Sequence, residues 1–181
     1  MRIVGGEARG RPLRAVPGRE TRPTADRVRQ SLFDALGQRM DGLRVLDLYA
    51  GTGALALEAV SRGAAGAILI ESDARACAAI FHNVAALRYE DRCRVVRAEL
   101  PAALRQLQGE RFDLIFSDPP YAQRTAQGTL DALSASGVLA PGARIVLETD
   151  RREPSAVPPP GLRLADERRY GDTRILIYAA D

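Results

Sequence analysis

The hydrophobic pattern of this chain changes near residue 44. Beyond that point, short apolar runs of strand length alternate with segments whose apolar side chains recur at helical spacing. This alternation predicts an α/β fold with βαβ crossovers and a parallel sheet covered on both faces. Gly171-Asp172, between the last two runs, predicts an antiparallel hairpin at the C-terminal edge. The expected strands are 44–49, 66–71, 93–97, 112–117, 144–148, 162–170 and 173–178, and the expected helices are 54–61, 73–87, 101–107 and 125–136.

The N-terminal part of the chain lacks this alternation. Residues 1–20 combine glycines, arginines and two short apolar stretches, which predicts a small hairpin or an extended arm. We therefore expect a basic N-terminal arm or hairpin and helix over residues 1–40. A domain with a mostly parallel seven-stranded sheet is expected over residues 41–181.

One helix is expected within the N-terminal part, over residues 25–36. Its apolar side chains fall on one helical face. Phe33 and Leu36 should pack inward, and Arg27 and Arg29 should be exposed on the other side.

Charge is distributed unevenly along the chain. The net charge is +3, but residues 1–30 hold eight arginines against three acids, a balance of +5 that leaves −2 for residues 31–181. A guanidinium pairs well with phosphate. This cluster favours an RNA or DNA contact over a merely solvated arm.

Several classes of function are disfavoured by the sequence. No apolar run approaches the roughly 20 residues of a membrane span. The first residues lack the apolar core of a signal peptide, so a cytoplasmic protein is expected. Cys77 and Cys93 have no CxxC spacing and His82 is the single histidine, so we expect no metal site. A monomer is favoured.

A glycine turn follows the first expected strand of the α/β part. Gly51 and Gly53 allow the backbone to approach a ligand closely, and Glu71 follows 20 residues after Gly51, where a carboxylate accepts ribose hydroxyls. This pattern alone does not separate NAD from another adenosine-containing cofactor. Asp47, four residues before Gly51, can face an amino-acid ammonium, which NAD lacks, so it favours S-adenosylmethionine.

Asp118-Pro119-Pro120-Tyr121 ends the fourth expected strand. Tandem prolines fix φ and hold the neighbouring carbonyls in place. The Asp118 carboxylate and the Pro119 carbonyl would form two acceptors for one NH2 group, and Tyr121 would offer a face on which a base can stack. A strand-ending turn with a surface aspartate is the simpler reading of this tetrapeptide alone.

Taken together, these motifs resemble the bacterial 16S rRNA guanine-N2 methyltransferases of the RsmD family, over essentially the whole chain. The glycine turn is shared by all class I methyltransferases, and Asp-Pro-Pro-Tyr by many that methylate amines. The N-terminal motifs are more specific to the family. The matching segments are Arg2-Ile3-Val4-Gly5-Gly6, Thr21-Arg22-Pro23-Thr24, Asp26-Arg27-Val28-Arg29, Leu46-Asp47-Leu48-Tyr49-Ala50-Gly51-Thr52-Gly53, Glu58-Ala59-Val60-Ser61-Arg62-Gly63, Asp118-Pro119-Pro120-Tyr121 and Tyr170-Gly171-Asp172-Thr173.

The resemblance implies a Rossmann-like class I methyltransferase that binds S-adenosylmethionine. By position, Asp47, Gly51 and Gly53 would hold the methionine part of the cofactor. Glu71 would hold the ribose, with Ser72 near the ribose and adenine.

The resemblance also implies a substrate, which is one guanine of 16S rRNA within a 30S subunit or an assembly intermediate. Asp118, Pro119 and Tyr121 would form the catalytic group. Arg22, Arg27 and Arg29 lie in the N-terminal motifs of the family and are candidates for RNA phosphate contacts or for closing over the cofactor site. Glu99 stands where the family usually has an aspartate near the adenine, so this contact depends on one extra methylene being tolerated.

Three other functions remain open from the residues themselves. Asp-Pro-Pro-Tyr also serves methylation of adenine N6 or of a side-chain amide. An NAD-dependent oxidoreductase would share the glycine turn, but its reaction does not require two acceptors that bind an amine. An RNA-binding module without catalysis would be expected to lose the tetrapeptide.

Overall fold

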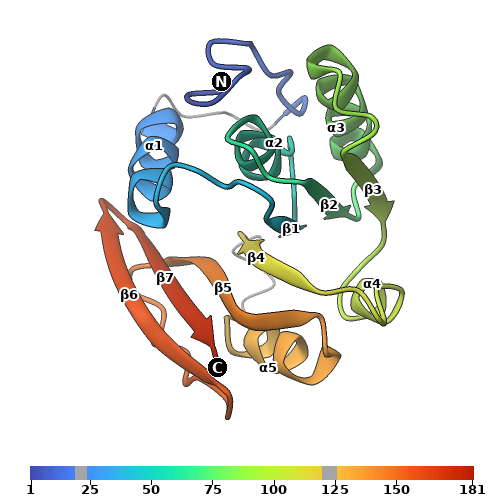
Figure 1. Cartoon of the computed structure of the whole chain (residues 1–181). Coiled ribbons are helices and arrows are strands. Elements are labelled where there is room, and N and C mark those ends of the chain that lie inside the picture. The colour runs from blue at the N-terminus through green and yellow to red at the C-terminus, as the bar shows by residue number, and fades with distance from the viewer. Residues whose placement is uncertain (19–23, 120–125) are drawn as a thin grey trace.

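Strands and helices alternate along the chain and form a three-layer α/β structure (Figure 1). The computed structural model describes residues 1–18, 24–119 and 126–181. In these residues one sheet has the strand order β3-β2-β1-β4-β5-β7-β6. The strands are β1 Arg44–Leu48, β2 Gly66–Glu71, β3 Cys93–Arg97, β4 Phe112–Ser117, β5 Leu139–Asp150, β6 Leu162–Tyr170 and β7 Thr173–Ala180, and the helices are α1 Thr24–Leu36, α2 Ala54–Ser61, α3 Ala74–Leu87, α4 Ala102–Arg105 and α5 Ala126–Ser136.

The first five strands are parallel, and β7 and β6 extend the sheet as an antiparallel hairpin. The predicted fold class is therefore confirmed. The bounds differ most at α4, which is a single turn, and at β5, which begins earlier and ends later than expected. None of the helices in the described ranges has the length and apolarity that a bilayer span requires.

Side chains on the two faces of the sheet enter separate cores. Val45 and Phe116 lie on one face with α1, α2 and α3, whereas Leu46 and Ile115 lie on the other face with α4 and α5. Alternate residues of a strand point to opposite faces, so the buried central strands are apolar on both sides. Asp47, two residues after Val45, therefore points toward the face that α2 covers.

The strand order reverses between β1 and β4. These neighbouring strands pair in parallel, with Leu48 opposite Ser117. In open α/β sheets, ligands bind outside the carboxyl ends of strands at such a reversal. The glycine turn after β1 and Asp118 after β4 thus lie on adjacent strands at the expected binding edge.

Helix α1 covers β4 and β5 and runs antiparallel to them. The Phe33 and Phe116 ring centroids are 5.8 Å apart, and Arg144, near the start of the paired part of β5, donates to the Leu36 carbonyl at 2.8 Å. Ser31 and Tyr170 bond through their hydroxyls at 2.9 Å. The N-terminal end of α1 therefore lies at the carboxyl edge of the sheet.

The first residues form a hairpin-like arm that packs on the α2 and α3 side. Arg2 and Pro12 form an antiparallel bridge, and Ile3 and Leu13 are buried in the core shared with α2. Apolar contacts thus join the arm to the α/β part. The division at residues 40 and 41 stays a prediction.

Candidate active site

Asp47 lies within β1, with its side chain buried against α2. Its Oδ2 accepts a hydrogen bond from the Ala56 N–H at 3.2 Å. Burial raises the pKa of Asp47 to about 8, the bond from Ala56 opposes this shift, and the negative charges of Asp118 and Glu71 add to it. Acidic side chains from three neighbouring strands therefore interact at one edge of the sheet.

The two glycines of the turn have different roles. Gly51 has φ 58° and Gly53 has φ 78°, both in the left-handed region that favours glycine. A Cβ on Gly53 would meet Leu69 Cδ2 at 2.9 Å, so Gly53 is required for packing. The nearest atom to a Cβ on Gly51 would be the Tyr49 carbonyl oxygen at 3.9 Å, so Gly51 leaves that side of the turn open.

Glu71, at the end of β2, holds the glycine turn. Its carboxylate accepts from the N–H groups of Gly51 at 2.9 Å, Ser72 at 2.8 Å and Asp73 at 2.9 Å. A carboxylate has about four acceptor positions, so about one remains for a further donor such as a ribose hydroxyl.

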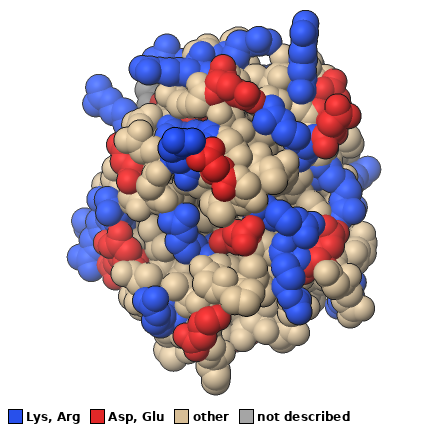
Figure 2. Space-filling view, viewed as in Figure 1, with Lys and Arg blue, Asp and Glu red and all other residues tan. Residues whose placement is uncertain are grey.

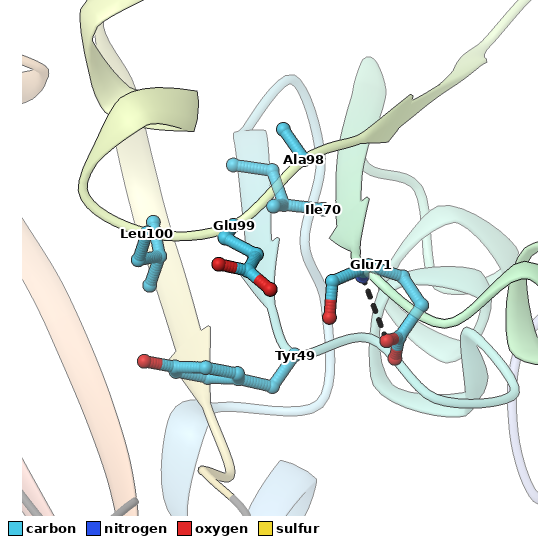
Figure 3. A pocket seen from close by; sticks show the side chains of 7 residues that line it. Tyr49, Ile70, Glu71, Ala98, Glu99 and Leu100 are labelled. Carbon is cyan, nitrogen blue, oxygen red and sulfur yellow. Dashed lines mark hydrogen bonds between the residues drawn. The ribbon is translucent and has the colours of Figure 1, made fainter.

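A small cavity of about 60 Å³ lies beside this turn. Figure 3 shows the Glu99 carboxylate above the Tyr49 ring, between Leu100 and Glu71. Three of the predicted cofactor residues thus share one cavity with four apolar or aromatic neighbours. Its lining residues are Tyr49, Ile70, Glu71, Ser72, Ala98, Glu99 and Leu100.

Tyr49 was not among the predicted site residues. It has φ 62°, which is uncommon for a residue with a bulky side chain and costs on the order of 1 kcal/mol. Such strain is frequent at ligand sites, and here it directs the ring into the cavity. Its position directly after a buried strand and two residues before Gly51 is the sequence signal for this role.

Asp118 directly follows β4, and Pro119 is the last described residue before the gap. Ser117, which precedes them, pairs with Leu48 of β1 on one side and with Leu147 of β5 on the other. Asp118 is thus held at the reversal of strand order. Tyr121 lies outside the described residues.

Glu148 is a further carboxylate at this edge that the sequence analysis missed. Burial raises its pKa to about 7, Asp118 adds to the shift, and a hydrogen bond from Thr173 opposes it. Glu148 is the last residue of an expected strand. The residues that surround it depend on the order of the strands, which the sequence pattern does not specify.

Comparison with known proteins identifies the family. The model of the family described as "Conserved hypothetical protein 95" matches residues 1–179. Ribosomal RNA small subunit methyltransferase D of Escherichia coli K12 is 36% identical over 178 residues, covering 98% of this chain and 89% of that protein. The chain belongs to the RsmD family of methyltransferases.

Other relatives agree with this membership. The RsmD protein of Haemophilus influenzae is 31% identical, over 98% of this chain and 93% of its own length. The solved structure of yhhF from Escherichia coli superposes with a TM-score of 0.88 at 34% identity, covering 100% of this chain and 98% of that one.

The residues at the carboxyl edge fit the RsmD cofactor, S-adenosylmethionine. This cofactor carries positive charge on its ammonium and sulfonium groups, and Asp47, Glu71 and Asp118 place three carboxyl groups at this edge. Gly51 offers an open backbone, and Glu71 and Glu99 share one cavity with the Tyr49 ring. Among the described residues, no group of three or more His, Cys, Asp or Glu is placed to hold a metal ion.

The three arginines proposed as RNA contacts of this RsmD protein have different positions. Arg27 is exposed near the N-terminal end of α1, whereas Arg22 lies outside the described residues. The expectation that Arg29 is exposed was wrong, because only 5% of its side chain is exposed. Its guanidinium donates to Asp26 at 3.0 Å, and its Nε lies 3.4 Å from Glu58. Arg29 therefore forms buried ion pairs inside the protein and is not a phosphate contact.

Proposed function

We propose that this protein transfers the methyl group of S-adenosylmethionine to the exocyclic N2 of a guanine in 16S rRNA. The observation that carries the proposal is that Asp47 lies in β1 and that Asp118 directly follows the adjacent strand β4, at the carboxyl edge of the sheet. One carboxylate suits the cationic methyl donor, and the other suits the amine that receives the methyl group.

The cofactor side of the site is formed by β1, β2 and the glycine turn. Asp47 faces the ammonium, Gly51 lets the backbone approach, and Glu71 accepts a ribose hydroxyl. Glu99 and Ser72 line the cavity in which the adenosine part would lie. When bound, S-adenosylmethionine supplies an electrophilic methyl group.

The substrate side is formed by the residues that follow β4. Guanine N2 is a poor nucleophile because its lone pair is delocalised into the ring. The Asp118 carboxylate and the Pro119 carbonyl accept hydrogen bonds from the two N2–H groups. This arrangement favours a pyramidal nitrogen with a localised lone pair. Tyr121 stacks on the base after the base has left its helix or loop. Positioning and electrostatics then supply most of the rate. The methylated nitrogen loses its extra proton after the methyl transfer, when that proton is acidic, so no strong general base is needed.

An RNA substrate is supported by the charge of the N-terminal part. Figure 2 shows basic side chains gathered along the upper rim of the molecule, over the N-terminal arm. Arg2, Arg9, Arg11 and Arg14 of this arm are exposed. The named relatives act on small-subunit rRNA. We propose a 30S subunit or assembly intermediate as the form in which the protein meets it.

Replacing Asp118 tests the proposal. Asp118→Ala should reduce methyl transfer to 16S rRNA or 30S particles by at least about a hundredfold, while cofactor affinity stays within a few-fold, because the lost contact is made to the reacting amine. Asp113→Asn is the matched control, since Asp113 lies at the opposite end of β4 and accepts from the Arg44 N–H at 2.8 Å. An Asp118→Ala enzyme that keeps more than about a tenth of the wild-type rate contradicts this role.

A further inference from the structure

Glu148 is a half-buried carboxylate beside the proposed substrate site, and the mechanism above gives it no role. In the parallel pair of β4 and β5, Phe116 lies opposite Val146. Side chains on one face recur every two residues, so Glu148 lies on the same face as Val146. The register of β4 and β5, continued by one residue beyond Ser117 and Leu147, therefore places Glu148 beside Asp118.

The electrostatics of the two carboxyl groups agree with this register. Asp118 raises the pKa of Glu148, in addition to the effect of burial. A hydrogen bond from the side chain of Thr173, on β7, lowers the pKa of Glu148 and so opposes this shift. Asp47 also lies on this face, because it pairs with Phe116 two residues before Asp118. The face thus presents a row of acceptors along the binding edge.

Within the described parts of the chain, Glu148 belongs to none of the ion pairs. The basic residue next to Thr173 on β7 is Arg174, which belongs to the opposite face of the sheet. Its guanidinium donates to the Thr149 hydroxyl at 3.3 Å, the Ser155 hydroxyl at 3.1 Å and the Glu153 carbonyl. A half-buried carboxylate beside another carboxylate costs stability, so its presence here favours a role in binding.

The Watson–Crick edge of guanine matches two neighbouring carboxylates. Guanine presents the N1–H beside the N2 amine, so these two neighbouring groups both donate hydrogen bonds. Adenine instead presents the N1 lone pair beside its N6 amine, and a carboxylate facing that lone pair has nothing to accept. A hydrogen bond from the exocyclic amine to Asp118 does not distinguish guanine from adenine, because both bases carry such an amine. A second acceptor that faces N1 does distinguish them.

We propose that Glu148 accepts the N1–H of the target guanine and so selects guanine against adenine. This inference rests on the proposed function, since it assumes that Asp118 and Pro119 hold the N2 amine. A hydrogen bond to a charged acceptor is typically worth a factor of about 10 to 100 in discrimination. Glu148 is thus a specificity-determining residue.

The test uses an RNA in which the methylated guanine, once mapped, is replaced by 2-aminopurine. This base keeps the 2-amino group but lacks the N1–H. Wild-type enzyme should prefer guanine over 2-aminopurine by about 10- to 100-fold in kcat/KM. In Glu148→Gln the preference should fall to within about threefold, because the glutamine amide can donate to an unprotonated N1.

The control and the outcomes separate this inference from the proposed function. Glu90→Gln, an exposed residue remote from the site, should keep the wild-type preference. A Glu148→Gln enzyme that loses rate equally on both RNAs would show a structural role and overturn the inference alone. If wild-type enzyme produced no N2-methylguanosine from the guanine RNA, the proposed function would fall, and this inference with it.

Discussion

At the scale of single residues, the pKa of Asp47 connects the site to pH. Its value of about 8 means that the side chain is mostly protonated at neutral pH. The cofactor ammonium favours the ionised form, so binding should release a proton, and affinity should rise between about pH 6 and about pH 8. Calorimetry in two buffers of different protonation enthalpy measures this release. Equal heats in both buffers would contradict it, and Asp47→Asn should bind more weakly with no such pH dependence.

The two glycines of the turn give a second prediction. Gly53→Ala should lower the free energy of unfolding by about 2 kcal/mol or more, because its Cβ overlaps Leu69 and its φ is positive. Gly51→Ala should lower the free energy of unfolding by only about 1 kcal/mol, the cost of a positive φ for alanine. Its methyl group would, however, hinder the approach of the cofactor to the backbone. Denaturant unfolding and cofactor titration of both variants should show mainly a stability loss in the first and mainly an affinity loss in the second. The reverse order would contradict the assignment.

At the scale of elements, a buried ion network joins α1, α2 and the arm. Glu58 is fully buried and binds Arg62 at 2.8 Å, Arg29 at 3.4 Å and the Val4 N–H at 2.8 Å. Glu58→Ala should lower the free energy of unfolding by about 3–5 kcal/mol, because it leaves two buried guanidinium groups without this carboxylate.

Denaturant unfolding measures the effect of Glu58→Ala. Asp41→Ala is its matched control, since Asp41 pairs with Arg39 on the surface and should change stability by less than about 1 kcal/mol. Similar losses in the two variants would show that the buried network contributes no more than a surface ion pair.

The elements were more predictable from the sequence than their contacts. β1, β2 and β4 were predicted nearly to the residue, because apolar runs between turns mark buried strands. The burial of Arg29 was missed, since its partner Glu58 lies on another helix. Glu148 was missed for the same reason, because its neighbour on β4 follows from strand order.

The arm shows a further limit of the sequence pattern. Ile3 and Leu13 are too far apart in the chain to form a periodic pattern, yet both are buried. Their burial depends on a surface that α2 and α3 supply. In the candidate site, the glycine turn and the acidic strand ends could be recognised as sequence motifs. The strain at Tyr49 could be recognised only from its φ angle in the structure.

At the scale of the whole molecule, the basic N-terminal part should attract RNA electrostatically. Affinity for 16S rRNA should fall steeply as salt rises, and Arg27→Gln should weaken binding and reduce the slope of log affinity against log salt by roughly 1. Arg39→Gln is the control, because Arg39 is exposed but lies after the other end of α1, where it pairs with Asp41. Filter binding across a salt series measures both. A salt-independent affinity would contradict a phosphate contact.

The chemical identity of the product is the most direct test of methylation at guanine N2. The protein is incubated with labelled S-adenosylmethionine and with 16S rRNA or 30S particles that lack the modification, and the digested nucleosides are analysed by mass spectrometry. We expect N2-methylguanosine at one position in the wild-type reaction and its loss with Asp118→Ala. Label recovered as N6-methyladenosine, or in protein, would contradict it.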